Sequence, residues 1–353
     1  MRKLMNNKNI FAFGLGLGTR NSQNEVIEVL YTVFQVNPSA QISQILMSIV
    51  PPTLDHSVFF ELNEENQKAL DSMLAEQNEI ELQTAVTRIV RANHPIIICV
   101  IKEDSPPLSI PEAFLKLHLL SSCLVRPHQI NIEGIFSILR NIAWTNQGPI
   151  DLQDLAKQRL TARASGKHLS VDSIDKFPKM TDYIVPPNVR IADSSRVRLG
   201  AFLGEGTTVM HEGFVNFNAG TDGPAMIEGR ISAGVIIGAN SDLGGGCSTM
   251  GTLSGGGKEI ISVGENCLIG ANAGIGIPLG DRCIVEAGLY VTAGTKLTTI
   301  DASGKVRDQI KARELAGKDD LLFRRNSITG AVECITSNQS AEVQLNTELH
   351  KND

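Results

Sequence analysis

Residues 191–215 read Ile-Ala-Asp-Ser-Ser-Arg-Val-Arg-Leu-Gly-Ala-Phe-Leu-Gly-Glu-Gly-Thr-Thr-Val-Met-His-Glu-Gly-Phe-Val, and an aliphatic side chain returns at every sixth position. The positions between these anchors hold mostly small or polar residues. A period of six fits neither an α-helix nor an amphipathic strand, whose periods are about 3.6 and 2. A hexad repeat with small spacers is typical of a parallel β-helix. Each six residues form one flat side, three sides close a rung, and the aliphatic side chains stack inward. The anchors are Ile191, Val197, Leu203, Val209 and Val215.

The same spacing continues along the chain. It is interrupted at Thr221 and resumes with Ile227 and the smaller Ala233. A loop region would not keep its phase through five hexads, and antiparallel barrel strands would alternate with period two and carry hairpin signals. The pattern therefore favours a β-helix. The later anchors are Ile237, Leu243, Val263, Ile269, Ile275, Val285, Val291 and Leu297.

Breaks in the repeat divide this half of the chain. The glycine-rich stretch near 249–258 predicts a projecting loop, and a second slip falls at 278–281. We expect the β-helix over residues 176–298 and a C-terminal segment over 299–353. In that segment, residues 311–315 predict a short helical turn, residues 321–326 a strand with a basic edge, and the polar residues from Ser337 a frayed tail.

Residues 1–175 mix strand and helix patterns and predict an N-terminal α/β or α+β domain. Ser39 is a good cap for a helix that Pro51-Pro52 ends. Gly14 and Gly16 suggest the glycine fingerprint of a dinucleotide-binding domain. That fingerprint requires a third glycine at position 19, which is Thr19, so a glycine-containing strand and turn fits better.

Composition excludes several classes of protein. The net charge of −6 and a pI near 5.7 argue against a nucleic-acid binder. No apolar run has the length of a membrane span, and the N-terminus lacks the apolar core of a signal peptide. The six cysteines are scattered without a CxxC pair, which predicts buried, reduced thiols and a cytoplasmic protein.

A flat-sided coil does not easily form a deep pocket alone. Three such coils packed side by side create grooves between subunits that suit long, extended ligands, and they cover flat apolar faces that a monomer would expose. The repeat therefore favours a homotrimer.

Several long motifs resemble the tetrahydrodipicolinate N-succinyltransferase family. They include Lys176-Phe-Pro-Lys-Met-Thr-Asp-Tyr, Met226-Ile-Glu-Gly-Arg-Ile-Ser-Ala-Gly, Val285-Glu-Ala-Gly-Leu-Tyr-Val and Leu321-Leu-Phe-Arg-Arg-Asn-Ser. The resemblance covers roughly residues 175–335, and the N-terminal half is similar to the proteobacterial branch. It implies a left-handed β-helix and a trimeric enzyme that moves a succinyl group from succinyl-CoA to the amine of an opened-ring dicarboxylate precursor of diaminopimelate and lysine.

The resemblance makes Glu228 the catalytic carboxylate. It follows the inward anchor Ile227, so its side chain points off the coil. The family assigns the matching glutamate as catalytic with a covalent acyl-anhydride, and a carboxylate also suits a general base. Two alternatives remain: a solvated Glu228 paired with Arg230, and His211 as the base.

No cofactor is obligatory, because succinyl-CoA is a co-substrate. The family assigns Glu212 as a ligand of a Mg²⁺ ion on the three-fold axis, where converging carboxylates would repel one another without a cation. The family's partner carboxylate falls at Ser195 in this chain, so the metal site is altered.

The remaining family positions concern substrate and CoA. Arg230 suits a succinyl or substrate carboxylate, and Gly245 and Ser248 could offer backbone N–H groups to the acyl carbonyl. Small residues along the CoA groove let pantetheine lie close, and basic residues meet its phosphates. These positions are Ala271, Glu286, Ala287, Gly294, Lys311, Arg324, Arg325, Asn326 and Ser327.

Three other functions remain open at this point. One is an acyltransferase of the same fold for another amine, such as that of a sugar or serine. Another is a γ-type carbonic anhydrase, which would need zinc-binding histidines, although the repeat contains only His211. The third is a non-catalytic β-solenoid, which would not need Glu228, Arg230 or the basic run near the C-terminus.

Overall fold

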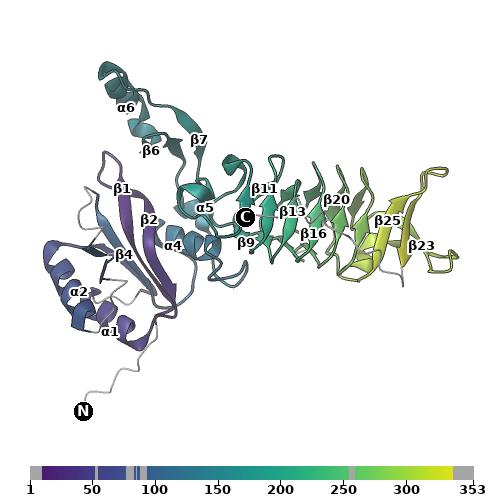
Figure 1. Cartoon of the computed structure of the whole chain (residues 1–353), viewed down its shortest axis with the longest axis horizontal. Coiled ribbons are helices and arrows are strands. Elements are labelled where there is room, and N and C mark those ends of the chain that lie inside the picture. The colour runs from purple at the N-terminus through teal and green to yellow at the C-terminus, as the bar shows by residue number, and fades with distance from the viewer. Residues whose placement is uncertain are drawn as a thin grey trace, which may run out of the picture. The chain divides into compact units, whose positions relative to one another are not determined.

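The computed structural model describes residues 10–51, 55–76, 83–84, 86–87, 94–253 and 259–336 (Figure 1). The chain forms two compact units. The first unit comprises Met1–Leu119 and Gln129–Pro178, and the second comprises Leu120–His128 and Lys179–Asp353. The described part of the C-terminal segment clusters with the repeat in the second unit. None of the helices in these described ranges is long and apolar enough to cross a membrane.

The first unit is built on a four-stranded sheet in the order β2-β1-β4-β3. Every strand pair in it is antiparallel, so of the two expected classes the unit is α+β. Sequence patterns identified the elements but not their direction, because strands that pair far apart in the chain leave no local signal. The strands are β1 (Ala12–Arg20), β2 (Val26–Val36), β3 (Ser57–Glu61) and β4 (Ile96–Ile101).

Helices pack against this sheet. Ser39 caps the first helix as predicted, accepting a hydrogen bond from the Ile42 N–H at 3.2 Å. The apolar stripe of that helix joins buried residues of the second helix and of the sheet in one core. Besides the helix of the small sheet described below, the described helices of this unit are α1 (Ala40–Ile49), α2 (Glu64–Glu76), α4 (Ile110–Ser121), which reaches the unit's edge, and α5 (Ile135–Ile138).

The glycines of β1 leave room for neighbouring atoms. A Cβ on Gly14 would lie 2.6 Å from the ring of Tyr31, and one on Gly16 would lie 2.2 Å from the Leu30 carbonyl oxygen. The glycine-containing strand is therefore confirmed.

A small three-stranded sheet with its own helix completes the first unit. The sheet has the order β6-β5-β7, and its core is formed by Ala143, Ile150, Ala162 and Leu169. Its elements are β5 (Ile142–Thr145), β6 (Gly148–Asp151), α6 (Leu152–Ala164) and β7 (Val171–Asp175).

The second unit is a three-sided coil of short parallel strands, and the chain visits its three faces in turn (Figure 1). Face 1 contains β8 (Arg190–Ile191), β10 (Thr207–Val209), β13 (Ala225–Ile227), β16 (Ser241–Leu243), β19 (Leu268–Ile269) and β21 (Ile284–Val285). Face 2 contains β11 (Phe214–Val215), β14 (Arg230–Ile231), β17 (Ser248–Thr249), β20 (Gly274–Gly276) and β22 (Tyr290–Thr292). Face 3 contains β9 (Phe202–Leu203), β12 (Gly220–Thr221), β15 (Ile236–Ile237) and β18 (Ser262–Val263). Short 3₁₀ turns, η1 (Met180–Asp182) and η2 (Ser194–Arg196), accompany the first rung.

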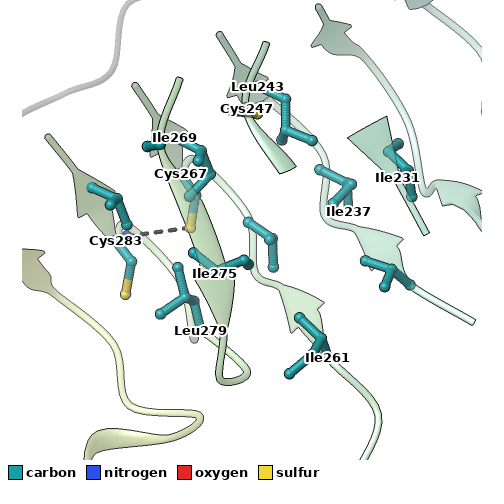
Figure 2. Close-up of a cluster of buried hydrophobic side chains, with 14 of the residues drawn as sticks. Ile231, Ile237, Leu243, Cys247, Ile261, Cys267, Ile269, Ile275, Leu279 and Cys283 are labelled. Atoms are coloured by element: carbon teal, nitrogen blue, oxygen red, sulfur yellow. Dashed lines mark hydrogen bonds between the residues drawn. The ribbon is translucent and has the colours of Figure 1, made fainter. Parts of the chain in front are cut away.

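The hexad anchors form the interior of this coil, as Figure 2 shows for Ile237, Leu243, Ile269 and Ile275. Buried thiols share this core, and the backbone N–H of Cys283 donates to the Cys267 sulfur at 3.2 Å (Figure 2). All six cysteines are free, in agreement with the predicted reduced thiols.

Two details of the predicted repeat are corrected. Thr221 does not shift the phase, because it occupies a buried anchor position and its hydroxyl lies 2.6 Å from that of Thr207. The anchor after Ile227 is the fully buried Ile231, not Ala233. The corner between these two isoleucines is two residues shorter than a hexad allows.

The predicted interruptions also lie in the second unit. The loop after β17 leaves the coil as two antiparallel arms, with the Leu253 N–H donating to the Glu259 carbonyl at 2.8 Å. Residues 254–258, at the centre of the predicted loop, lie outside the described residues. At 278–281 the chain shortens another corner, so that Leu279 is the buried residue four positions after Ile275.

Two hairpins close the C-terminal end of the coil. The predicted basic strand is β25, and it pairs in parallel with β21 of face 1. The predicted helical turn is η3 (Ala312–Leu315). The predicted frayed tail from Ser337 lies outside the described residues. The hairpin strands are β23 (Lys296–Ile300) with β24 (Val306–Lys311), and β25 (Leu321–Arg325) with β26 (Val332–Thr336).

Candidate active site

One edge of the coil collects six of the predicted site residues. Each follows an anchor of face 1, at the corner where the chain turns to face 2. Because successive rungs stack in register, residues far apart in the sequence line up along this corner, which we call the 1–2 corner. Its predicted site residues are Glu212, Glu228, Gly245, Ala271, Glu286 and Ala287.

Glu228 occupies the shortened rung of the 1–2 corner. Its N–H donates to the Leu243 carbonyl at 2.8 Å, and its own carbonyl accepts from the Gly246 N–H at 3.2 Å. The backbone is thus held by the next rung while the half-buried side chain points off the coil. Arg230 forms no ion pair within the described part of the chain, so the solvated Glu228–Arg230 pair is not what the structure shows.

Gly245 brings two carboxylates to one point. A Cβ at this glycine would lie 3.4 Å from Oε2 of Glu212 and 3.5 Å from Oε2 of Glu228. The Gly245 N–H has no acceptor among the residues that the structure describes. Ser248 differs, because its N–H donates to the Ala273 carbonyl at 3.0 Å. The expectation that Ser248 offers a backbone N–H to the acyl carbonyl is therefore wrong, and its hydroxyl is the group that remains.

Asp242 is a further acidic residue that sequence reasoning missed. It lies on the outer side of face 1, in register with Met226 and Leu268. Burial raises the pKa of its carboxyl, and the negative charge of Glu228 raises it further. Burial raises the pKa of the Cys247 thiol to about 12, with added contributions from Asp242 and Glu228.

Ser195 and Glu212, the two positions that the resemblance connects with a metal, lie among side chains that form hydrogen bonds of their own. The Ser195 hydroxyl donates to Oδ1 of Asp193 at 2.6 Å. This hydrogen bond, followed by one from the Ser195 N–H, lowers the pKa of Asp193, and His211 also favours its charged form. Arg196 donates to the backbone oxygen of Glu212 at 2.8 Å, which leaves that exposed carboxylate without a cationic partner in the described residues. Within the part of one chain that the structure describes, no three or more His, Cys, Asp or Glu side chains are grouped so that they could hold a metal ion.

Face 2 carries a row of outward side chains beside the 1–2 corner. In register along it lie Phe214, Arg230, Ser248, Gly274 and Tyr290. The Arg198 guanidinium lies 5.8 Å from the centre of the Phe214 ring, at the start of the row. The exposed Arg230 thus stands between Phe214 and Ser248, with Glu228 two residues earlier in the chain.

The predicted basic residues near the C-terminus play unequal roles. Arg324 is paired with Glu333 at 2.9 Å, and Asn326 donates to the same carboxylate at 2.8 Å. Both hydrogen bonds lower the pKa of Glu333, that from Asn326 the more. The charge of Arg324 is therefore already balanced by a residue that sequence reasoning missed.

Arg325 has no carboxylate partner in the described residues. Its guanidinium donates to the Gly330 carbonyl at 3.1 Å, and its N–H donates to Oε2 of Glu286 at 2.5 Å. Glu286 therefore anchors β25 to the 1–2 corner. The exposed Ser327 lies in the turn after β25.

Lys311 faces another lysine. It pairs with Lys296 across the β23–β24 hairpin, and neither exposed side chain has an acidic partner among the described residues. Like charges directly opposite one another are destabilising, which favours an anionic ligand at this place. Gly294 is exposed at the preceding corner, and nothing lies within 4 Å of the position of a Cβ.

Comparison with known proteins shows what the chain is similar to. A family model described as "Tetrahydrodipicolinate N-succinyltransferase middle" matches residues 139–179, and one described as "Hexapeptide repeat of succinyl-transferase" matches residues 260–293. The 2,3,4,5-tetrahydropyridine-2,6-dicarboxylate N-succinyltransferase of Pseudomonas paraeruginosa is 57% identical over 345 residues, covering 97% of this chain and 98% of the relative. The protein of that name from Vibrio cholerae is 52% identical, covering 97% and 99%.

A solved structure agrees with these relatives. A crystal structure from Campylobacter jejuni, provisionally assigned as a 2,3,4,5-tetrahydropyridine-2-carboxylate N-succinyltransferase, matches with a TM-score of 0.87. It is 33% identical, and the match covers 95% of each chain.

Proposed function

Because this chain belongs to the 2,3,4,5-tetrahydropyridine-2,6-dicarboxylate N-succinyltransferase family, we propose that it transfers a succinyl group from succinyl-CoA to the amino group of tetrahydrodipicolinate in its open-chain form, 2-amino-6-oxopimelate. The product is N-succinyl-2-amino-6-oxopimelate, on the route to diaminopimelate and lysine. The chain is thus a CoA-dependent N-acyltransferase. The observation that carries this proposal within the structure is the convergence of Glu212 and Glu228 on Gly245.

Glu228 is the catalytic carboxylate of this proposal. As a general base it accepts the proton of the amine while the amine nitrogen attacks the thioester carbonyl carbon, and the C–S bond breaks to release CoA. As a nucleophile its carboxylate attacks the same carbon first. The C–S bond then breaks, CoA leaves and an acyl-anhydride is formed. Attack of the amine on this anhydride gives the amide and restores the carboxylate. In either route the N–H of Gly245 donates to the developing oxyanion; its lack of an acceptor among the described residues supports this role.

The binding residues follow from their surroundings. The Arg230 guanidinium has no ion-pair partner among the described residues and suits a carboxylate of donor or acceptor, and Ser248 lies in register beside it. The short side chains of Ala271 and Ala287 and the bare Gly294 let the pantetheine arm lie close to the coil.

The CoA phosphates meet Lys311, Arg325 and the turn at Ser327 in this proposal, because the two cations have no carboxylate partner in the described residues. Arg324 and Asn326 position that turn through Glu333.

We further propose a left-handed coil and a homotrimer. The match to a hexapeptide-repeat family model supports the hand of the coil. Grooves between three coils would give an extended CoA molecule two walls, and closed symmetry would cover flat faces. The free thiols fit a reducing compartment, and we propose the cytoplasm.

Each subunit would contribute one magnesium ligand, the carboxylate of Glu212. In a trimer, three copies of Glu212 would hold the ion on the axis, and its chemistry there would be to neutralise their mutual repulsion. Ser195 adds no carboxylate. If this is right, Mg²⁺ should raise the Tm of the wild-type trimer and not that of Glu212→Gln. An equal rise in both proteins would contradict the assignment.

The test of function is CoA release by the purified protein with tetrahydrodipicolinate, comparing succinyl-CoA with acetyl-CoA. Removing a base or nucleophile should lower kcat of Glu228→Gln by at least about 100-fold. Glu265→Gln, an exposed glutamate at another corner of the coil, is the matched control and should keep wild-type activity. Activity of Glu228→Gln within tenfold of wild type would move the chemistry to His211. Absence of turnover with both donors would contradict the proposed function.

The two routes for Glu228 are separated by an exchange experiment. Labelled CoA is mixed with succinyl-CoA and enzyme without the acceptor. An acyl-anhydride exchanges the label into succinyl-CoA, whereas a general base requires the acceptor and leaves the label in free CoA.

A further inference from the structure

The requirement for glycine at position 274 comes from side-chain packing and not from its backbone conformation. It lies within β20 of face 2 and does not adopt a positive φ. A Cβ at this position would lie 2.2 Å from Cε2, 2.4 Å from Cδ2 and 2.5 Å from Cζ of Tyr290. Atoms cannot approach so closely, so the bare glycine provides the surface on which the Tyr290 ring lies.

This packing fixes the direction of Tyr290. The residue belongs to the next strand, β22, and pairs directly with Gly274. Since Cζ lies above Gly274, the side chain leans along face 2 toward Ser248 rather than out into solvent. The ring is nevertheless 45% exposed. Its hydroxyl has no partner among the residues that the structure describes.

The hydroxyl therefore joins a row of polar groups. Ser248 lies one strand beyond Gly274, and Arg230 lies one strand beyond Ser248. With neighbouring strands about 4.8 Å apart, Arg230 and Gly274 are separated by roughly 10 Å. Arg230 stands at one end of this interval and the Tyr290 phenol over Gly274 at the other, and Ser248 lies on the strand between them.

A carboxylate matches this row. Its two oxygens accept about four hydrogen bonds, and a guanidinium supplies two of them in a planar fork. The Ser248 and Tyr290 hydroxyls supply one each. Building on the succinyl transfer proposed above, we infer that Tyr290, seated on Gly274, binds a substrate carboxylate together with Arg230 and Ser248, beside the catalytic Glu228. Tyr290 is thus a binding residue, and Gly274 positions it.

The carboxylate has two sources, the succinyl group of the donor and the dicarboxylate acceptor. Butyryl-CoA separates them, because it has the same chain length with a methyl group in place of the carboxylate. If the donor carboxylate is bound, Tyr290→Phe raises the KM for succinyl-CoA and not for butyryl-CoA. If the acceptor carboxylate is bound, the KM for tetrahydrodipicolinate rises with both donors.

The experiment compares the full-length wild type with Tyr290→Phe, Gly274→Ala and their combination. Losing one hydrogen bond to a charged group corresponds to a rise in KM of about tenfold. Gly274→Ala should cause at least the same rise, because its methyl group displaces the ring. The double variant should be no worse than Gly274→Ala, since both changes remove the same hydroxyl. Ser262→Ala, which removes an exposed hydroxyl from face 3, is the control.

The outcomes are distinct from those that test the overall reaction. Wild-type turnover decides the proposed function, and its absence would overturn this inference as well. If the wild type turns over and the KM values of Tyr290→Phe lie within twofold of the wild-type values for every substrate, this inference is overturned and the proposed function stands. Tyr290→Phe keeps the ring on Gly274, so it decides the matter even if Gly274→Ala fails to fold.

Discussion

His118 should make the first unit sensitive to acid. The residue is fully buried on α4. Its Nδ1 lies 2.7 Å from the Phe114 carbonyl, which can only accept a hydrogen bond, and the Tyr31 N–H donates to its Nε2 at 3.3 Å. The ring is therefore the neutral tautomer with the proton on Nδ1. Protonation of Nε2 would break the hydrogen bond to β2 and place a charge in the core.

The pKa gives the size and the sign of this effect. Burial lowers the pKa of His118 from 6.5 to about 4. The unfolded chain takes up the proton near pH 6.5, whereas the folded protein resists it until about pH 4. Acidification through this window therefore favours the unfolded state. At about 1.4 kcal/mol for each unit of pKa, the free energy of unfolding should fall by about 3 kcal/mol between pH 7 and pH 4.

Urea unfolding measures this loss. Trp144 is the only tryptophan and lies in the same unit, so its fluorescence reports the transition. His118→Gln removes the titrating group, and we expect a variant that is less stable at pH 7 but has a flatter pH dependence. The gap between the two proteins should close by about 3 kcal/mol toward pH 4. Parallel curves, or a Tyr31 amide whose hydrogen exchange is unchanged in the variant, would refute the reasoning.

Two further predictions concern the second unit. Burial raises the pKa of Asp242, so the folded protein binds its proton more tightly than the unfolded chain, and the ionised form costs stability at neutral pH. Asp242→Asn should therefore raise the Tm at pH 7, and this gain should vanish at a pH below 3.8, the usual pKa of an aspartate. An equal gain in Tm under the two conditions would contradict the prediction. Arg325→Gln should raise the KM for succinyl-CoA several-fold with little change in Tm. Arg324→Gln should lower the Tm more than it changes the KM, because it breaks the pair with Glu333, and the reverse pattern would exchange their roles.

Local spacing predicted the coil because each anchor interacts with the rung directly above or below it. A period of six therefore predicted the flat faces without knowledge of the whole fold, whereas the site residues came from the family resemblance. The spacing predicted Ala233 as the anchor after Ile227, whereas the structure has Ile231 there. Both residues are apolar, so composition gave no reason to depart from the six-residue spacing. Only the stacked rungs show that the chain shortens the corner at Glu228. The sequence left the first unit between α/β and α+β for a related reason, since strand direction depends on pairing between distant segments.

The sequence by itself determined the period and the order of the elements, and its motifs carried the family resemblance that implied the site residues. It could not determine which charges are already balanced or which way a side chain leans. Arg324 and Arg325 are neighbours of the same type, yet only Arg324 is paired with Glu333. The Tyr290 ring lies on a glycine that is distant in sequence. Such facts belong to the tertiary structure, because they depend on atoms that meet across strands, and sequence spacing does not record those distances.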